Sequence, residues 1–406
     1  MHTSPLSLLQ QIQENLLMQL DTKHERKEFL KLLNNSWSQA QVLIWERWVG
    51  KTTLLLQYLK TQNNGFYFSV DNSIITDLNQ LVVELVLKKG IDTVIIDEIH
   101  TYPERQQHLK SIIDALPQIQ LIVSGSSSLD LYEWTSALAR RTNLIQVPTL
   151  SFWEYCLLQY DFLLPKIQFE QLISDHEAIS FTYNSAQVEI YFDEYLKHGF
   201  YPYTLDKTIN YHDTLRRNLQ KTIIFDIPTF LNFETDNLHK IEKLFYFIAH
   251  TPPSDFNYTN MSKKLWISPH RLETVISYLE KIWVINLMVR SNKLSDIMRK
   301  EYKALLGNPN MYHAYTQESN RWSIRESFVT HALRKVQNKQ ILPDEFILPH
   351  YWDIIFSHNN TRYLFEIWWK RKSDKQIAWI KNSYVVSDIM LWTQNKIPLW
   401  LFGLLE

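Results

Sequence analysis

The segment that decides the expected fold reads Trp45-Glu46-Arg47-Trp48-Val49-Gly50-Lys51-Thr52-Thr53. It matches the phosphate-binding loop G-x-x-x-x-G-K-S/T at every fixed position except the first, where Trp45 stands in place of glycine. Such a loop points backbone N–H groups at the phosphates of a nucleotide, while its lysine reaches the β and γ oxygens and its hydroxyl residue binds Mg²⁺. The segment therefore predicts a nucleotide site made by Trp45, Val49, Gly50, Lys51, Thr52 and Thr53.

The residues on both sides of this loop fit the same structure. The apolar run 41–44 precedes it, as a buried strand would, and residues 53–59 have the periodicity of a helix. A helix that begins here presents its N-terminus to the anion. Strand, loop and helix together predict the site more strongly than the Gly-Lys-Thr triplet alone.

Two adjacent carboxylates end a second apolar strand, in the segment Val94-Ile95-Ile96-Asp97-Glu98-Ile99-His100. Phosphoryl transfer needs neutralisation of charge and a positioned nucleophile. We therefore assign Asp97, together with Thr52, to Mg²⁺. We assign Glu98 to polarising the water that attacks the γ-phosphate, with Lys51 as a further catalytic residue. The alternative is a buried strand that ends in a solvated acidic turn, and the nearby Gly-Lys-Thr loop disfavours it.

A third strand, at residues 121–123, runs into Ser124-Gly125-Ser126-Ser127-Ser128. We assign Ser126 to contact with the γ-phosphate or the attacking water, and a serine-rich turn that caps the following helix is the alternative. Arg140 and Arg141 follow. One of these guanidinium groups, which we take to be that of Arg141, could reach a phosphate in the same or a neighbouring subunit. A solvated surface pair is the alternative for the two arginines.

With these motifs, nearly the whole chain resembles the prokaryotic AAA-type ATPases that carry a C-terminal domain of unknown function. The resemblance rests on VGKTTLL at 49–55, IIDEIH at 95–100, SGSSSL at 124–129, LARR at 138–141 and PTLSFWEY at 148–155. Further matches are YLKHGFYPYTL at 195–205, FEIWWKRK at 365–372 and NKIPLWLFG at 395–403. The resemblance implies ATP, rather than GTP, as the nucleotide.

The chain departs from that family in one direction, because tryptophan stands where glycine is expected. It has 7 glycines and 14 tryptophans, whereas ordinary usage would give about 28 glycines in a chain of this length. Within the motifs the affected positions are Trp45, Trp266, Trp352, Trp368 and Trp369. Other tryptophans stand where a turn or a close backbone approach would suit glycine: Trp37, Trp48, Trp283, Trp322, Trp379 and Trp392.

One cause could explain all of these positions, since an indole meets none of the conformational needs of a glycine. Our hypothesis is that the codon UGA, which some bacterial lineages read as glycine, was translated here as tryptophan. The alternative is a natural, degenerate paralogue with an inactive nucleotide loop, although random decay would not choose tryptophan repeatedly.

Length and composition limit the class of protein. At about 150 residues per domain, 406 residues give two or three domains. The single Cys156 excludes a disulfide framework and a cysteine-based zinc site. The sequence has no secretory signal pattern and no apolar stretch long enough to span a membrane, so we expect a cytoplasmic protein with no membrane partner. A formal net charge of -1 argues against a protein that coats nucleic acid.

The pattern along the chain predicts an α/β protein. We expect a P-loop NTPase parallel sheet with a helical lid, followed by a winged helix and a C-terminal α/β restriction-endonuclease-like domain. Strands of the first sheet are expected at 42–45, 66–70, 94–97 and 121–124. The expected domains are N-terminal helices at 1–35 that pack on the core, an AAA-type ATPase core at 36–150, a helical lid at 151–235, a winged helix at 236–305 and the endonuclease-like domain at 306–406.

The winged helix is inferred from the order helix, turn, helix and strand between residues 238 and 289, with Ser268 as the cap of the second helix of a helix-turn-helix. Such a helix can enter the major groove of DNA, which makes DNA a candidate partner. Basic residues nearby could follow a phosphate backbone or simply be solvated: Lys293, Arg299, Lys300 and Lys303. A winged helix that only packs between domains is the alternative.

A weaker group in the last hundred residues is similar to the metal site of restriction-endonuclease-like folds. There, two carboxylates bind Mg²⁺ and a lysine helps to activate water. The group here is Glu326, Asp353, Glu366 and Lys370. Its Glu-to-Lys spacing is longer by two than the usual E-x-K, yet positions 366 and 370 still share one face of a strand. A degenerate fold kept for packing or DNA contact is the alternative. The closing segment 397–402 predicts a buried terminal strand.

Three functions remain open from the sequence. The first is an ATPase in which binding and hydrolysis of Mg-ATP drive a conformational switch, with an unidentified protein partner and a homo-oligomer as further expectations. The second is a DNA-binding or DNA-cleaving protein that ATP gates. The third is a non-catalytic scaffold with a degenerate phosphate loop.

Overall fold

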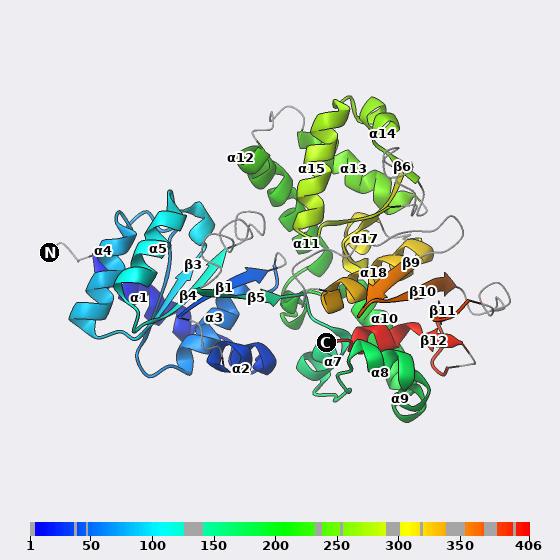
Figure 1. Cartoon of the computed structure of the whole chain (residues 1–406), viewed down its shortest axis with the longest axis horizontal. Coiled ribbons are helices and arrows are strands. Elements are labelled where there is room, and N and C mark those ends of the chain that lie inside the picture. Colours follow the sequence, from blue (N-terminus) through cyan, green and yellow to red (C-terminus); the bar gives the residue numbers. More distant parts are fainter. Residues whose placement is uncertain are drawn as a thin grey trace. The chain divides into compact units, whose positions relative to one another are not determined.

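The computed structural model describes residues 5–35, 39–45, 48–125, 141–231, 238–251, 255–289, 301–316, 320–337, 354–368, 380–392 and 395–406. The chain divides into two compact units, Met1–Thr149 and Leu150–Glu406 (Figure 1). Within the described residues, no helix is long and apolar enough to cross a membrane.

A five-stranded parallel sheet forms the centre of the first unit, with the strand order β2-β3-β4-β1-β5 (Figure 1). Four of its strands are predicted by the sequence, and β3 is buried along its whole length, as expected for a parallel sheet covered on both faces. The sequence analysis does not predict β5, an edge strand whose few apolar residues stand among Thr142, Asn143 and Gln146. The strands are β1 (Ala40–Trp45), β2 (Gly65–Ser69), β3 (Thr93–Asp97), β4 (Gln120–Gly125) and β5 (Thr142–Val147).

Helices cover both faces of this sheet. Successive residues of β1 point to opposite faces, so Val42 joins one apolar cluster and Leu43 joins another. The first cluster includes α1 (Pro5–Met18), α4 (Leu78–Val83) and α5 (Arg105–Ala115), and the second includes α2 (Lys27–Asn35) and α3 (Lys51–Lys60). A π-helix, η1 (Glu84–Lys88), continues α4, and the 3₁₀ helix η2 (Ile99–Thr101) follows β3. The N-terminal helices therefore pack on the sheet, as expected.

The position of β4 between β1 and β3 brings three strand ends into one row. The pairs Ile44 with Gly125 and Ile96 with Val123 set the register of these strands. The loop after β1, the serine-rich end of β4 and the acidic end of β3 consequently meet at the same edge. Parallel α/β sheets bind their ligands at this carboxyl edge.

The second unit begins with helices, as the sequence predicts for this segment. They are α7 (Phe152–Tyr160), α8 (Phe169–Ser174), α9 (His176–Tyr183), α10 (Ala186–His198), η3 (Pro202–Leu205), α11 (Tyr211–Lys221), η4 (Thr222–Asp226) and α12 (Ile227–Leu231). They share a core with the last part of the chain. The ring of Phe169 packs against Phe356, and the backbone N–H of Ile167 donates to the carbonyl of Leu404 at 3.0 Å. Cys156 of α7 is fully buried, and burial raises the pKa of its thiol.

A three-stranded antiparallel sheet and three helices follow. In chain order the elements are α13 (Leu238–His250), β6 (Asp255–Asn257), α14 (Tyr258–Leu265), α15 (Pro269–Lys281), β7 (Ile285–Val289) and β8 (Glu301–Leu306), and the strand order is β6-β8-β7. The prediction that Ser268 caps α15 is confirmed, because its hydroxyl accepts a hydrogen bond from the backbone N–H of Arg271 at 3.4 Å.

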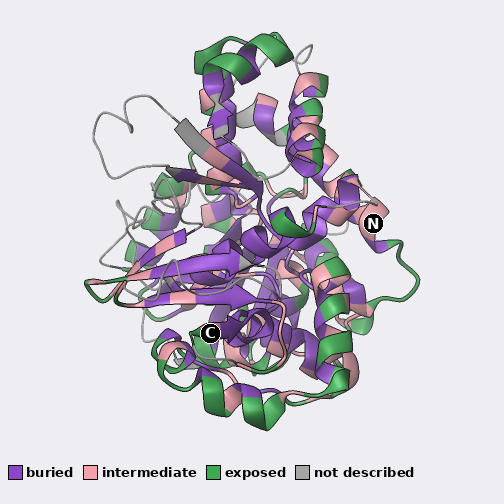
Figure 2. Cartoon of the chain, turned by 90° about the vertical axis from the view of Figure 1, so that its right-hand side faces the viewer, coloured by how far each residue is buried: buried purple, intermediate pink, exposed green. Residues whose placement is uncertain are grey.

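The last elements form a four-stranded sheet with two helices and a 3₁₀ segment. They are α17 (Pro309–Tyr315), α18 (Arg321–Gln337), β9 (Ile354–His358), β10 (Thr361–Trp368), β11 (Ser383–Ser387), β12 (Lys396–Pro398) and η7 (Leu399–Leu404). Strand β9 is antiparallel to β10, and β10, β11 and β12 are parallel. The predicted terminal strand is largely wrong, since Pro398 has no N–H to continue a ladder and the chain turns into η7. Its predicted burial is confirmed (Figure 2).

One buried amide joins distant segments of the second unit. Asn310 of α17 is fully buried, and its Nδ2 donates to the carbonyls of Tyr195 and Leu196 at 3.1 and 2.8 Å. Its Oδ1 accepts from the backbone N–H of Phe200 at 2.9 Å. The last carbonyls of a helix have no intrahelical partner. Asn310 therefore completes the C-terminal end of α10.

We expect Asn310→Ala to lower the free energy of unfolding by about 3 kcal/mol or more, because each buried polar group left without a partner costs about 1–3 kcal/mol. Urea unfolding followed by far-UV circular dichroism measures the change. Gln187→Ala, at an exposed position of α10, is the control and should change the free energy by less than about 0.5 kcal/mol. Equal stability of the two variants would refute this role of Asn310.

Candidate functional site

The loop after β1 contains two left-handed backbone positions. Trp48 has a φ of 64°, and Gly50 has a φ of 80° and a ψ of 37°. Helix α3 begins at Lys51, and the first N–H groups of a helix have no intrahelical partner. Alternating backbone conformations at a helix N-terminus make a concave group of N–H donors that suits an anion. The side chain of Trp45 and residues 46–47 lie outside the described residues.

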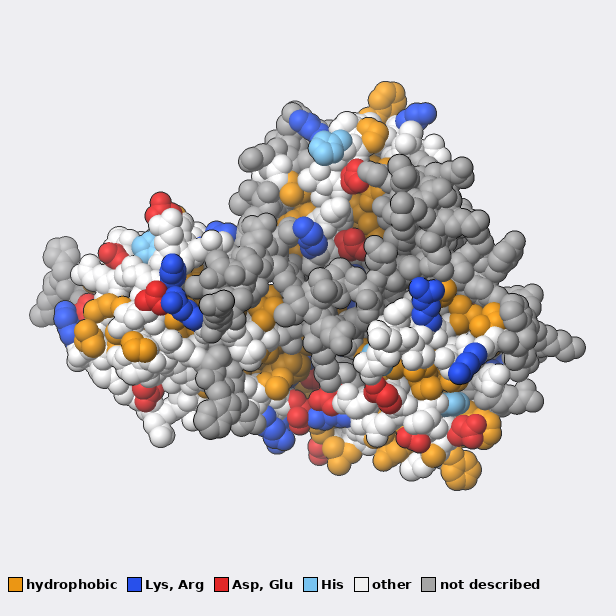
Figure 3. Space-filling model, viewed as in Figure 1, with side chains coloured by type: hydrophobic (Ala, Val, Ile, Leu, Met, Phe, Trp, Pro, Cys, Tyr) orange, Lys and Arg blue, Asp and Glu red, His pale blue; other side chains and the backbone are white. Residues whose placement is uncertain are grey.

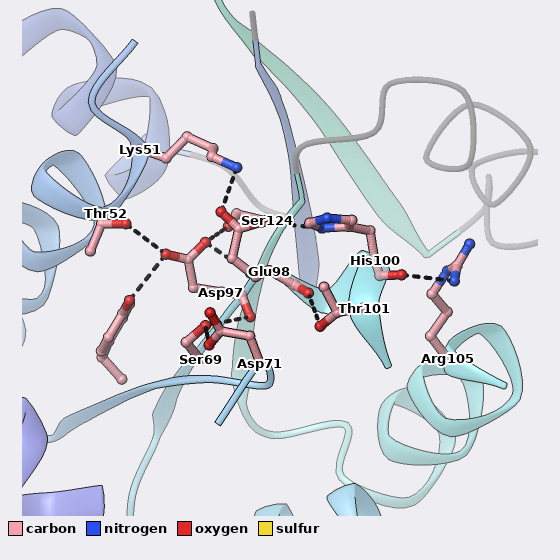
Figure 4. A network of polar contacts seen from close by, with 11 residues as sticks. Lys51, Thr52, Ser69, Asp71, Asp97, Glu98, His100, Thr101, Arg105 and Ser124 are labelled. Atoms are coloured by element: carbon pink, nitrogen blue, oxygen red, sulfur yellow. Dashed lines mark hydrogen bonds and ion pairs between the residues drawn. The ribbon is translucent and has the colours of Figure 1, made fainter. Parts of the chain in front are cut away.

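The carboxylate of Asp97 is the centre of the polar network at this edge (Figure 4). Its Oδ2 accepts hydrogen bonds from the Thr52 hydroxyl at 2.9 Å and the Tyr67 hydroxyl at 3.0 Å. Its Oδ1 accepts from the backbone N–H of Glu98 at 2.9 Å and from the Ser124 hydroxyl. Burial and the charge of Asp97 raise the pKa of Tyr67, so this phenol stays protonated and donates.

Glu98 leaves β3 in a left-handed conformation, with a φ of 53°. Its carboxylate is held from two sides: Lys51 Nζ lies 2.8 Å from Oε1, and His100 Nδ1 lies 3.1 Å from Oε2 (Figure 4). The Lys51 side chain is only 11% exposed and the Glu98 side chain 26%. The Lys51 ammonium and the Glu98 carboxylate therefore neutralise each other.

The turn that carries Glu98 is fixed by its own hydrogen bonds. Both the backbone N–H and the hydroxyl of Thr101 donate to the carbonyl of Glu98, at 3.0 and 2.9 Å. Arg105 Nη1 donates to the carbonyl of His100 at 2.9 Å, and Ile99 is fully buried beneath the turn. The backbone of residues 98–101 is thus well supported, although Glu98 has a conformation that is uncommon outside glycine.

The structure brings together Lys51, Thr52, Asp97 and Glu98, which the sequence assigns to one site. It adds Tyr67, Ser124 and His100, which the sequence analysis does not assign. Ser124 and His100 lie inside the quoted motifs, so their proximity to the carboxylates could have been anticipated. Tyr67 could not, because its hydroxyl reaches Asp97 from the neighbouring strand. Ser126 and Arg140 lie outside the described residues.

Arg141 occupies the opposite edge of the sheet. It precedes β5, and Ala40 at the start of β1 pairs with Thr142. The phosphate loop follows the other end of β1, about 17 Å away along the strand at 3.3 Å per residue. The Arg141 guanidinium instead pairs with Asp114 at 2.5 Å. Within its own chain Arg141 therefore does not join this site, and a contact with a neighbouring subunit stays a prediction.

The carboxylates predicted for a C-terminal metal site lie partly within the described residues. Glu326 of α18 forms a buried ion pair with Lys303 of β8, and Glu366 is buried on β10. Lys303, which the sequence groups with solvated or DNA-facing residues, is thus directed inward, because it neutralises a buried carboxylate. Asp353 and Lys370 lie outside the described residues. Among the described residues, no group of three or more His, Cys, Asp or Glu side chains could hold a metal ion.

Three tryptophans occupy backbone conformations that favour glycine. Trp48, Trp266 and Trp283 have φ values of 64°, 54° and 62°, and this left-handed region is costly for a residue with a Cβ atom. Trp266 is also 85% exposed, so packing of its indole does not compensate for that cost. By contrast, Trp322 is the second residue of α18 and has no left-handed backbone, so its position does not favour glycine. The backbone therefore supports the glycine hypothesis at these three positions. It does not at Trp322, nor at Trp45, whose backbone is the extended end of β1.

Comparison with known families identifies two segments of the chain. Residues 38–156 match the model of the AAA domain, and residues 189–322 match that of a domain of unknown function (DUF8612). The first segment contains the sheet, the loop and the two carboxylates described above. It is an AAA-type P-loop NTPase domain.

Similar whole proteins do not narrow the function further. An uncharacterized protein of Methanocaldococcus jannaschii, MJ1637, is 25% identical over 320 residues, which cover 74% of this chain and 67% of that protein. The RuvB Holliday junction branch migration motor of Thermotoga maritima is 16% identical, with a TM-score of 0.29, over 72% of this chain and 91% of that chain. A structure of self-assembling katanin is 21% identical, with a TM-score of 0.24, over 39% of this chain and 57% of that chain.

We expect Trp266→Gly to stabilise the protein by about 1 kcal/mol, because it relieves a left-handed conformation and exposes no core. Trp322→Gly is the matched control and should destabilise by about 1 kcal/mol, since it places glycine in a helix. Thermal and urea unfolding of the two variants measure these changes. If both substitutions destabilise, the backbone at residue 266 does not select glycine.

Proposed function

We propose that the first unit binds Mg-ATP and hydrolyses it, and that the nucleotide state drives a conformational switch in the chain. The observation that carries this proposal is the convergence of Lys51, Thr52, Asp97 and Glu98 at one edge of the sheet. They provide a cation for phosphate, oxygen ligands for a metal and a base for water. That combination is what phosphoryl transfer requires.

The phosphates would bind at the N-terminus of α3. Their negative charge interacts favourably with the free N–H groups of the first helical turn and with the Lys51 ammonium. Lys51 now pairs with Glu98. The γ-phosphate would therefore replace the Glu98 carboxylate as the anion beside Lys51.

The Thr52 hydroxyl and the Asp97 carboxylate are suited to hold Mg²⁺. Mg²⁺ prefers oxygen ligands and keeps several of its waters, and these two oxygens already lie 2.9 Å apart. When bound, Mg²⁺ neutralises charge on the phosphate oxygens. The hydrogen bonds from Tyr67 and Ser124 would keep the Asp97 carboxylate oriented.

Glu98 would act on the attacking water. As the water oxygen forms a bond to the γ-phosphorus, the bond from that phosphorus to the β–γ bridging oxygen breaks and the Glu98 carboxylate accepts the proton. ADP and phosphate are the products. Lys51 would stabilise charge on the transferred group.

Trp45 decides whether the chain as written can carry out this reaction. Glycine at the first loop position allows the backbone to approach the phosphates closely, and an indole would not. If the chain with Trp45 does not hydrolyse ATP, that result is what the scaffold hypothesis predicts. If the Trp45→Gly variant does hydrolyse ATP, that result is what the recoding hypothesis predicts.

We expect the Trp45→Gly variant to hydrolyse ATP faster than the chain with Trp45, in a steady-state assay with Mg²⁺. In that variant, Lys51→Ala should weaken ATP binding by about tenfold or more, because hydrogen bonds to charged groups contribute about 1.5–3 kcal/mol. Glu98→Gln should retain binding and lower kcat by about a hundredfold or more. Undiminished turnover in Glu98→Gln would rule out the assigned base.

DNA is a second candidate ligand, through α14, α15 and the strands β6, β7 and β8. Their order along the chain and in the sheet supports the proposed winged helix, whose second helix would enter the major groove. Exposed basic groups lie on these helices: Lys263, Lys264, His270 and Arg271. In Figure 3 blue and pale blue side chains lie over this region at the top of the view, with hydrophobic and acidic groups among them. The charge therefore suits a limited DNA contact better than an extended one.

We expect Arg271→Ala to weaken binding to duplex DNA and to lower the salt dependence of the binding constant by about one counterion, because each phosphate contact releases about one. Lys207→Ala is the control for loss of one positive charge, because Lys207 is exposed and lies far from Arg271 in the sequence. Fluorescence anisotropy at several salt concentrations gives both quantities. Absence of DNA binding by the parent chain would remove this candidate.

Cleavage of DNA by Glu326 and Glu366, with Asp353 and Lys370, remains a separate proposal. A Glu366→Ala variant that loses DNA cleavage while ATP turnover is retained would support it. Assembly of several copies, with Arg141 supplied to a neighbouring site, likewise remains a proposal.

A further inference from the structure

The carboxylate of Glu98 has two partners that would respond differently to nucleotide. Lys51 holds Oε1 and His100 holds Oε2, at 2.8 and 3.1 Å. Under the proposed function, on which this inference rests, the phosphates draw the Lys51 ammonium away from Oε1. Of the contacts that the described residues make with this carboxylate, the one from His100 would then remain.

His100 is well placed to hold Glu98 at that stage. Its side chain is only 12% exposed, and its carbonyl is fixed by Arg105 Nη1. The residue also belongs to η2, whose first turn is closed by the hydrogen bonds from Thr101 to Glu98. The imidazole and the carboxylate are therefore carried by one rigid turn, and their separation does not depend on the phosphate loop.

We propose that His100 is a positioning residue for hydrolysis. Its Nδ1–H donates to Oε2 of Glu98 and keeps the carboxylate directed at the attacking water after Lys51 has moved to the phosphates. A neutral imidazole is sufficient for this donation, and it leaves the carboxylate negative and able to accept a proton. Without it, the Glu98 side chain is free to rotate or to pair with Lys51 again.

The test compares His100→Ala with His100→Asn in the full chain carrying Trp45→Gly, by steady-state hydrolysis and by binding of a non-hydrolysable ATP analogue. We expect His100→Ala to lower kcat by about tenfold to a hundredfold, as expected for a misplaced catalytic group, while the Kd of the analogue stays within about twofold of the parent value. Asparagine keeps an N–H donor of similar reach and should recover part of the loss. His108→Ala is the matched control, because its ring packs on Tyr102 and is not in the Glu98 pair.

A double-mutant cycle identifies the route of the effect. In a Glu98→Gln background, His100→Ala should cause no further fall in kcat, because its action passes through the carboxylate. A parent that hydrolyses ATP and a His100→Ala variant with unchanged kcat would overturn the positioning role alone. Equal losses of kcat and analogue binding in His100→Ala and His108→Ala would also overturn it, since that result indicates a structural effect. A parent without hydrolysis would overturn the proposed function, and this inference with it.

Discussion

A single buried carboxylate organises the first unit. Asp97 accepts hydrogen bonds from Thr52 of α3, Tyr67 of β2 and Ser124 of β4, while it terminates β3 itself. These elements belong to separate crossovers of the sheet. Because all three donate to the same carboxylate, their positions relative to one another are fixed. Loss of the carboxylate would leave three hydroxyl groups without this acceptor at the same edge. The arrangement of the loop relative to the acidic strand therefore depends on Asp97 before any ligand arrives.

Charge balance is the second constraint on this edge. Lys51 and Glu98 are both largely shielded from water, and a buried charge without a partner is costly. Their pairing lowers that cost in the absence of nucleotide. An incoming anion would take the place of Glu98 beside Lys51. The Lys51 ammonium is therefore already paired before the anion binds.

Local patterns were sufficient to predict the residues that lie at the ends of β1 and β3, because strand, loop and helix signals coincide at Lys51 and Asp97. They could not predict contacts that depend on strand order, such as Tyr67 with Asp97. Nor could they predict β5, or the inward direction of Lys303, which follows from the burial of Glu326. The expected terminal strand was wrong after Pro398, where an apolar pattern fits a 3₁₀ helix equally well. The positive φ values at Trp48 and Trp266 accord with glycine-like positions expected from the sequence.

The burial of Cys156 has a practical consequence for following motion in this protein. A thiol that is inaccessible and resists ionisation reacts slowly with maleimides and other alkylating dyes. Cysteines introduced at exposed sites of both units can consequently be labelled selectively while the native residue is kept. Fluorescence energy transfer or spin-label distance measurements would then report whether the units change their separation as nucleotide is added.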